Sequence, residues 1–229
     1  MQALSTKNSL KLDAQTSPVA LAQQGDDVQW AVVNNMQIAA TFSTPDVEQA
    51  RKKVLGVTDV SCFHRYGFKG PKAAQWAVDH ELAIPSNPNA WTLSDKKSLV
   101  LRLGGSEFVV EDQPGGDACQ KLASVTARSA GVYKVPRADA AFILSGSAVL
   151  NLFSELCSLD LRPSSVLVSD VIMTQVAGIS AIVLRQTIAG EPVYRIWCDG
   201  TYGAYMWKTL IKIAVELGGG AVGLASYQH

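Results

Sequence analysis

The chain has 229 residues, and its 20 basic and 20 acidic side chains give a formal net charge of zero. This balance excludes the strongly basic surface of a typical nucleic-acid-binding domain, and it leaves little charge repulsion between copies, which favours a protein that works within a complex. The 48% hydrophobic content supplies a substantial core, and the length fits one large domain or two small, tightly coupled ones.

The cysteines and the apolar runs bear on the compartment. The four cysteines show no CxxC spacing and no dense disulfide framework, so we expect reduced thiols in a cytoplasm; they are Cys62, Cys119, Cys157 and Cys198. The opening stretch MQALSTKNSLKLDAQTS lacks the apolar segment of a signal peptide, and no run approaches the roughly 18 to 20 apolar residues of a membrane span. We therefore expect a soluble, cytoplasmic protein.

Residues 1–45 are predicted to be an N-terminal extension, rich in Ser, Thr, Asn and Gln, with a strand candidate at VQWAVV (28–33). A first structural unit follows the extension. Alternating side chains over 60–68 predict a strand, which ends at a Lys-Gly turn closed by Gly70. Pro71 suits the first position of a helix, because proline has no N–H to leave unpaired there, and alanines at helical spacing come next.

A hairpin and a second helix complete this unit. Residues 82–97 (LAIPSNPNAWTLSDKK) are predicted to be a loop because of their prolines and asparagines. The run LVLRLGGSEFVVE from Leu99 predicts two strands joined by a glycine turn, and a helix is predicted from about Asp117.

The same order of elements recurs later in the chain. An apolar strand over 140–144 is followed by a Ser-Gly turn, by Ser147 as a helix N-cap, and by an apolar stripe at helical spacing. The run IVLRQTIAGEPVYRIW from Ile182 then predicts another hairpin. The last helix is predicted from about Thr201 to a glycine cap at Gly218.

Two copies of strand–helix–hairpin–helix predict the fold class. We expect an α+β protein made of two pseudo-duplicated ferredoxin-like halves, each with an antiparallel sheet packed against helices, over residues 46–135 and 136–217. A chance recurrence of short apolar patterns is the alternative, but the agreement in order, turn chemistry and spacing argues against it. The tail at 218–229 is glycine-rich and aperiodic, so it is predicted to be flexible or ordered by a partner.

Several segments, taken in order, resemble the glycine-cleavage T-protein-like, folate-binding family. They are DVSCFHRYGFKGP, CSLDLRPSSV and SAIVLRQTIAGEPVYRIWCDGTYGAYMWKTLIKIAVELGG. The resemblance covers roughly residues 55–217. It is nearest to the gamma subunits of heterotetrameric sarcosine oxidases, at the LDL stretch around Asp160 and at the YMWKTL stretch that begins with Tyr205.

The resemblance implies a T-protein-like fold that serves, in the gamma subunits, as a non-catalytic structural component. It implies that the partners are the other subunits of a flavin-dependent amine oxidoreductase, which carry the flavin and the NAD, and that this chain binds neither. We therefore expect a non-catalytic structural subunit of a sarcosine-oxidase-like heteromeric amine oxidoreductase, with no nucleic-acid or membrane partner.

One hairpin element bears on whether folate chemistry is retained. Folate-using members of the family resemble one another at G-E-x-G-Y-E, and this chain reads GEPVYR at 190–195, with Val193 at the second glycine and Arg195 at the second carboxylate. Carboxylates pair with the N–H edge of a pterin, whereas a guanidinium opposes that pairing. Glu191 is therefore the single candidate cofactor-binding residue, and the alternative interpretation is a solvated turn glutamate.

Three other titratable residues are candidates for chemistry: Asp95, Cys62 and His64. T-proteins resemble one another at an Asp-Asp strand that positions the reactive folate nitrogen. In this chain the comparable Asp95 stands alone before two lysines, which favours a solvated loop. Cys62 and His64 are two apart on the predicted strand and would share a face, as a nucleophile with its base or as metal ligands. Nothing nearby completes either kind of site, so a buried cysteine with a hydrogen-bonded histidine is favoured. No catalytic or metal-binding residue is predicted.

Two alternatives to the structural subunit remain. One is a stand-alone pteridine- or tetrahydrofolate-binding protein or an aminomethyltransferase-like enzyme, which needs a pocket with Glu191 or Asp95 turned inward. The other is a binding module of unknown ligand on the same fold. For the structural subunit, Tyr202, Tyr205 and the tail from Gly218 are the expected interface residues, because aromatic side chains make good anchors.

Overall fold

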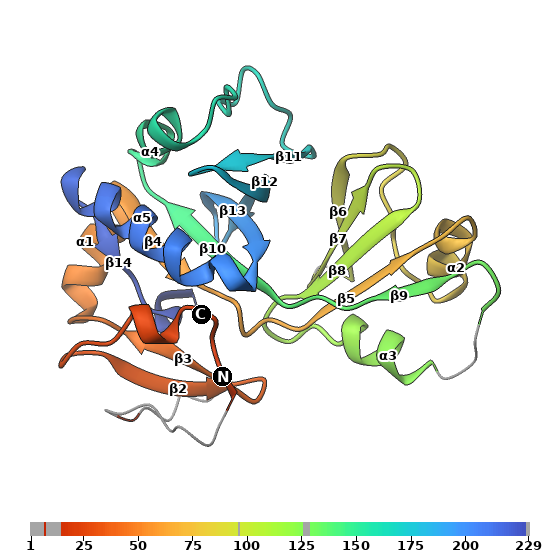
Figure 1. Cartoon of the computed structure of the whole chain (residues 1–229), viewed down its shortest axis with the longest axis horizontal. Coiled ribbons are helices and arrows are strands. Elements are labelled where there is room, and N and C mark those ends of the chain that lie inside the picture. Colours follow the sequence, from red (N-terminus) through yellow and green to blue (C-terminus); the bar gives the residue numbers. More distant parts are fainter. Residues whose placement is uncertain (1–6, 8–14, 96, 126–128, 228–229) are drawn as a thin grey trace. The chain divides into compact units, whose positions relative to one another are not determined.

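The computed structural model describes residues 7, 15–95, 97–125 and 129–227, and it is a mixed α+β structure. The chain divides into two compact units (Figure 1). The described residues of the first unit are 7, 15–62, 139–168 and 173–227, and those of the second are 63–95, 97–125, 129–138 and 169–172. The predicted first half, 46–135, is thus divided between the two units after residue 62.

The first unit is built on a six-stranded sheet. Its strands, in spatial order, are β11 (Val171–Val176), β12 (Ile179–Ile188), β13 (Glu191–Asp199), β10 (Asp139–Ser145), β4 (Gly56–Asp59) and β14 (Gly220–Ala221). The β12–β13, β13–β10 and β10–β4 pairs are antiparallel, and the β4–β14 pair is parallel. A second, three-stranded sheet has the order β1 (Gln15–Thr16), β3 (Met36–Thr41) and β2 (Gln29–Val33).

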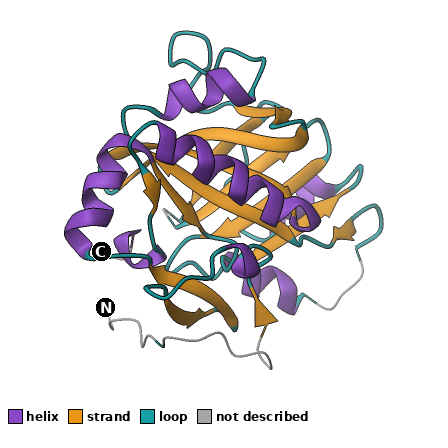
Figure 2. Ribbon diagram, turned by 60° about the vertical axis from the view of Figure 1, so that its left-hand side comes forward, coloured by secondary structure: helices purple, strands orange, loops and turns teal. Residues whose placement is uncertain are grey.

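Helices cover the larger sheet of this unit. They are α1 (Pro45–Leu55), α4 (Val149–Leu156) and α5 (Gly203–Glu216), with short 3-10 turns η1 (Ala20–Ala22), η2 (Gly200–Tyr202) and η3 (Leu224–Tyr227). Figure 2 shows the long helix α5 lying across the strands, where it contacts β10 and β4. The predicted apolar stripes are buried: Phe153 of α4 meets Tyr194 edge-on with ring centroids 5.2 Å apart, and Trp207 of α5 lies 6.3 Å from Phe142.

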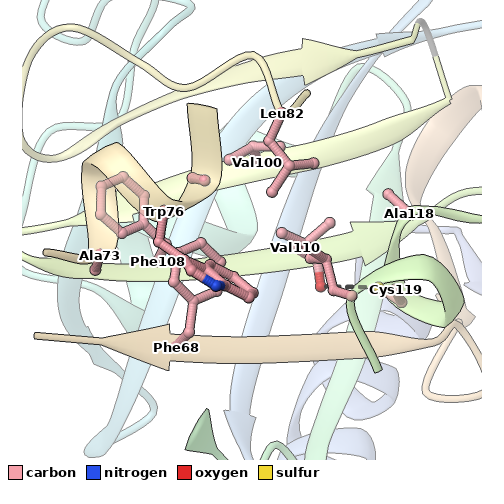
Figure 3. Close-up of a cluster of buried hydrophobic side chains, with 11 residues drawn as sticks. Phe68, Ala73, Trp76, Leu82, Val100, Phe108, Val110, Ala118 and Cys119 are labelled. Atoms are coloured by element: carbon pink, nitrogen blue, oxygen red, sulfur yellow. Dashed lines mark hydrogen bonds between the residues drawn. The ribbon is translucent and has the colours of Figure 1, made fainter. Parts of the chain in front are cut away.

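The second unit has a five-stranded sheet and two short helices. The strand order is β6 (Ala90–Ser94), β7 (Ser98–Leu103), β8 (Glu107–Asp112), β5 (Arg65–Lys69) and β9 (Tyr133–Val135), all antiparallel; the helices are α2 (Ala73–Asp79) and α3 (Ala118–Ser124). Figure 3 shows its core, in which Phe68 and Phe108 stack at 5.2 Å and Trp76 of α2 packs edge-on against Phe68 at 4.9 Å. Both predicted hairpins and all four helices expected within 60–217 are present where the sequence places them.

The structure corrects the strand predicted over 60–68. β4 ends at Asp59 and β5 begins at Arg65, so the intervening residues form a turn. The carboxylate of Asp59 accepts hydrogen bonds from the amide and the hydroxyl of Ser61, at 2.9 and 2.6 Å, which is the local bonding that bends a chain away from extended structure.

Two other local predictions are wrong in part. The predicted loop at 82–97 contains strand β6, because the residues from Ala90 to Ser94 pair with β7. Ser147 is not the N-cap of α4; that position is Ala148, and the Ser147 amide instead donates to the carbonyl of Lys53 at 3.0 Å.

The tail from Gly218 is packed on its own chain, in contrast to the predicted flexible or partner-ordered segment. β14 pairs with β4, and the side chains of Val222 and Leu224 are fully buried. The carboxylate of Glu48 on α1 accepts from the Gly223 amide at 2.9 Å and from the Ser226 hydroxyl at 3.0 Å. The sequence pattern did not predict this packing, because the segment is glycine-rich and has no helix or strand of ordinary length.

Across the described ranges, no helix combines the length and apolar character required to cross a membrane.

Candidate functional site

Glu191, the predicted candidate, lies at the start of β13 beside a pocket of about 280 Å³ in the first unit. The other walls come from Lys52 and Lys53 in the last turn of α1, from residues 145–147 at the end of β10 and after it, and from Pro192. Hairpin pairing of β12 with β13 brings the Gly190 turn to this position. The structure therefore places Glu191 beside a cavity within a single unit.

The Glu191 carboxylate is paired with a buried lysine. Lys52 Nζ lies 2.9 Å from Glu191 Oε2, and the two side chains are 8% and 45% exposed. The same ammonium sits 4.3 Å from the centre of the Tyr227 ring and 3.4 Å from the carbonyl oxygen of Ser226. Glu191 is thus the half-buried ion-pair partner of a lysine that also contacts Ser226 and Tyr227.

Arg195 stands where the resemblance expects a second carboxylate, and it is fully buried. Its Nη1 donates to Gln186 Oε1 at 3.2 Å, and its guanidinium lies 4.7 Å from the centre of the Trp197 ring. Removing a cation from water is costly unless neighbouring groups compensate its charge. The contacts with Gln186 and Trp197 therefore help to stabilise the Arg195 guanidinium inside the sheet.

A group of hydroxyls lies next to this arginine. Burial raises the pKa of Tyr227 to about 12, while the hydroxyls of Ser145 and Thr58 and the charge of Arg195 act in the opposite direction. The oxygens of these three hydroxyls are buried and lie close to one another.

Asp95 lies in the second unit, whereas Glu191 belongs to the first. It occupies the turn between β6 and β7 with φ of +53°, is exposed, and accepts from the amides of Lys97 and Ser98 at 3.0 and 3.1 Å. Asp95, with His80 and Lys121, also borders a pocket of about 580 Å³ in this unit. The turn explains the isolated aspartate: its side chain satisfies backbone amides of the hairpin.

The predicted pairing of Cys62 and His64 on one strand face is wrong, because both residues lie in the turn between β4 and β5. Cys62 is a buried residue of the first unit, whereas the His64 side chain is exposed and belongs to the second. The carbonyl of His64 accepts hydrogen bonds from the amide of Asp112 and the thiol of Cys119. Burial, reinforced by the Asp112 charge, raises the pKa of Cys119, so this thiol is held protonated.

In the part of the chain that the structure describes, no group of three or more His, Cys, Asp or Glu side chains is arranged to hold a metal ion. All four cysteines lie in that part, are buried and form no disulfide.

Sequence reasoning missed the buried carboxylates, which include Asp59 and Glu48. Asp59 accepts from the hydroxyls of Ser17 and Ser61 and from Gln23, and burial raises its pKa despite these bonds. The Asp-x-Ser spacing was a local signal for the turn at Asp59. Glu48 offers no such signal, because its partners are at the end of β3 and in the C-terminal segment.

Comparisons with known proteins point to the fold alone. No protein-family model and no curated protein sequence matches the chain. The structure is similar to the glycine cleavage system aminomethyltransferase T from Bartonella henselae, with a TM-score of 0.70 and 15% identity over 94% of this chain. The match covers 61% of that protein, so this chain spans less than two thirds of its length.

A second solved structure is also similar. A chain of the heterotetrameric sarcosine oxidase from Corynebacterium sp. U-96, solved in complex with pyrrole 2-carboxylate, aligns with a TM-score of 0.62 and 20% identity. This alignment covers 77% of the present chain and 93% of that one. The resemblance found in the sequence is therefore confirmed at the level of architecture, and the chain has the T-protein-like fold.

Proposed function

We propose that the chain is a non-catalytic structural subunit of a sarcosine-oxidase-like heteromeric amine oxidoreductase. The likeness to one chain of a heterotetrameric sarcosine oxidase, over 93% of that chain, supports this proposal. The flavin and NAD belong to the partner subunits in this proposal, and the complex is cytoplasmic. The role of this chain is to hold the larger chains together.

The observation that carries the proposal is the burial of Arg195. A pterin needs carboxylates on its N–H edge, and this chain buries a guanidinium at the position of one of them. The remaining carboxylate, Glu191, is bound to Lys52. To bind a pterin through these positions, the chain would have to move the Arg195 guanidinium away and break the ion pair between Glu191 and Lys52.

Exposed aromatic residues supply the surface that the proposal needs. Tyr202 and Tyr205 are each about half exposed, at 50% and 52%, where η2 leads into α5. The Tyr205 hydroxyl donates to the carbonyl of Ala177 at 3.2 Å, which holds the ring in place. A preordered aromatic ring loses little entropy on binding and makes a strong anchor.

Co-expression with the flavin-bearing and NAD-bearing subunits of such an enzyme tests the role. We expect the chain to co-purify with them, and Tyr205→Glu to weaken its retention about tenfold or more, because hot-spot residues carry a large share of the binding energy. Val215→Glu is the matched control: Val215 is also on α5 and is 60% exposed. A chain that purifies alone as a stable monomer beside such partners would contradict the proposal.

A second candidate is a stand-alone pteridine- or tetrahydrofolate-binding protein or aminomethyltransferase-like enzyme. The position of Glu191 beside a pocket favours it. Calorimetry with tetrahydrofolate separates the candidates, because binding that is lost in Glu191→Gln supports the second one. If tetrahydrofolate gives no heat of binding with the wild-type chain, the result supports the structural subunit.

The proposal includes pseudo-duplicated ferredoxin-like halves. The strand orders of the two large sheets support this part: β6-β7-β8-β5-β9 in one unit corresponds to β11-β12-β13-β10-β4 in the other. In each order a hairpin lies beside the strand that precedes the first helix of the repeat. Superposing the two units on these strands tests the duplication, which requires the helices to align as well.

A further inference from the structure

A pocket of about 830 Å³ lies in the second unit, next to the aromatic part of its core. Tyr66 and Phe68 of β5 and Trp76 of α2 border it, together with residues 129–134, which lead into β9. Small-molecule sites have volumes of about 300–1,000 Å³ and combine apolar and aromatic walls with a few polar groups. The size and the lining of this pocket therefore fit a small organic ligand.

The rings beside the pocket offer flat apolar surfaces. Tyr66 and Trp76 are close to parallel, with an angle of 18° between their planes and ring centroids 6.4 Å apart. Phe68 meets Trp76 edge-on at 4.9 Å (Figure 3), so the rings hold one another in place. Tyr66 packs against the core and is only partly buried, which leaves part of its ring open to the pocket. Such rings favour a ligand whose apolar part is itself a planar ring.

The indole N–H of Trp76 is a donor without an acceptor. Trp76 is only 7% exposed, and nothing in the described ranges accepts a hydrogen bond from its Nε1. This nitrogen is not sealed off by protein atoms, and Trp76 borders the pocket. The N–H of a nearly buried tryptophan usually has a hydrogen-bond partner. The unused donor therefore indicates that an acceptor enters from the pocket.

The charge beside the pocket selects the sign of the ligand. Among the described residues that border the pocket, Lys134 is the only charged one. Its ammonium lies 5.0 Å from the centre of the Tyr66 ring and forms no ion pair with any described residue. Burial raises the pKa of Tyr66, so its hydroxyl keeps its proton at neutral pH and is available as a further donor. An unpaired ammonium with neutral donors near it suits an anion that has acceptor oxygens.

We propose that this pocket binds a planar aromatic monocarboxylate. The rings of the ligand lie against Tyr66 and Trp76, its carboxylate pairs with the Lys134 ammonium, and a ligand oxygen accepts from the Trp76 indole N–H. The inference does not rest on the proposed subunit role, because the interface residues of that role, Tyr202 and Tyr205, belong to the first unit.

2-Naphthoate is the probe for the test. The full chain is labelled with ¹⁵N and titrated at constant ionic strength, while NMR follows the indole N–H signals of its five tryptophans. We expect a saturable shift of the Trp76 indole signal and much smaller shifts of the others. 2-Naphthylmethanol, which has the rings without the charge, binds about threefold or more weakly, and acetate, which has no ring, gives no saturable shift.

Substitution of the lysine separates the charge from the rings. Lys134→Gln weakens 2-naphthoate binding about two- to fivefold and leaves 2-naphthylmethanol binding unchanged. Lys97→Gln is the matched control, because Lys97 is an exposed lysine of the same unit in the turn between β6 and β7, and it leaves both affinities unchanged. Trp76→Phe keeps a ring and removes the N–H, so it weakens 2-naphthoate binding about fivefold, followed by the amide signals of residues 131–134.

Three results overturn the proposal. They are a Trp76 indole signal that does not shift or does not saturate, equal affinities for 2-naphthoate and 2-naphthylmethanol in the wild-type chain, and a loss in Lys97→Gln as large as that in Lys134→Gln. The pteridine-binding alternative places its ligand beside Glu191 in the first unit, and the subunit role is read out by co-purification. Failure of either is therefore distinguishable from failure of this inference.

Discussion

Both carboxylate oxygens of Glu48 are occupied by donors. Oε1 accepts from the amides of Phe42 and Ser43, and Oε2 accepts from the amide of Gly223 and the hydroxyl of Ser226. In Glu48→Gln, either orientation of the amide turns its NH2 group toward backbone donors. We expect a loss of about 1–3 kcal/mol in the free energy of unfolding, measured by urea denaturation.

Glu155→Gln on α4 is the control for this substitution, because Glu155 is exposed. Its effect should stay within about 0.5 kcal/mol. Equal effects of the two substitutions would show that the Glu48 contacts contribute nothing to stability.

Asp59 gives a prediction about pH. Its carboxyl is buried, and burial raises its pKa above the ordinary value of 3.8 even though Ser17, Ser61 and Gln23 donate to it. The stability that depends on the raised pKa is complete below pH 3.8 and is lost as the pH rises through the folded-state pKa. Asn remains neutral throughout, so the Tm of Asp59→Asn relative to the wild type should increase as the pH rises from about 4.

Asp160→Asn provides the contrast of opposite sign. Hydrogen bonds from Arg162 and Ser165 lower the pKa of the exposed Asp160, so its contribution is present above pH 3.8 and is lost as the pH falls below it. A Tm difference for Asp59→Asn that is constant with pH, or that decreases as the pH rises, would contradict the assigned direction.

At the scale of elements, the turn between β10 and α4 depends on one glycine. Gly146 has φ of +104°, and a Cβ at this position would lie 2.5 Å from the carbonyl carbon and oxygen of Val54. The close approach lets the Ser147 and Ala148 amides donate to the last carbonyls of α1, at 3.0 and 2.8 Å. The turn therefore caps one helix while it starts another.

Substitution of this glycine combines backbone strain with overlap. We expect Gly146→Ala to lower the free energy of unfolding by at least about 3 kcal/mol in thermal or urea denaturation. Gly178 also has positive φ, at +77°, but a Cβ there meets nothing within 4 Å. Gly178→Ala should therefore cost only about 1 kcal/mol, and equal losses would refute the role of the Val54 contact.

Sequence reasoning predicted elements whose signal is local. Apolar runs around a glycine turn predict the hairpins from Leu99 and Ile182, and apolar residues at helical spacing predict α4. The sequence did not predict β6, because its five residues follow a proline-rich loop and form a strand only by pairing with β7. The C-terminal segment was hidden for a similar reason, since its partners lie in β4 and α1.

In the candidate site too, features that depend on residue type were predicted, whereas contacts between distant segments were not. The GEPVYR comparison identified Glu191 and the charge change at Arg195, because both are readable from residue type. No local pattern could indicate that Lys52, 139 positions earlier in the chain, binds Glu191, or that Tyr227 lies over the same lysine. Contacts between distant segments depend on the fold, and the fold here was suggested by resemblance more than by periodicity.

At the scale of the whole molecule, the two compact units have separate cores. Phe68, Phe108 and Trp76 pack in the second unit, whereas Phe142 and Phe153 belong to the buried layer of the first. The chain passes between the units several times, at 62–63, 138–139, 168–169 and 172–173. Each core is closed by strands that pair within its own sheet, so each can lose its packing without breaking the hydrogen-bonded ladder of the other.

A matched pair of cavities tests whether the units open separately. Leu101 on β7 and Leu144 on β10 are almost completely buried, at 1% and 0% exposure, one in each unit. Either Leu→Ala substitution should cost about 2–5 kcal/mol, because it removes apolar contacts and leaves a cavity. Hydrogen exchange should then show that Leu101→Ala lowers protection mainly in β5, β7 and β8, and that Leu144→Ala lowers it mainly in β10, β12 and β13. Equal losses across both sheets for either variant would mean that the chain opens as one cooperative body despite its two cores.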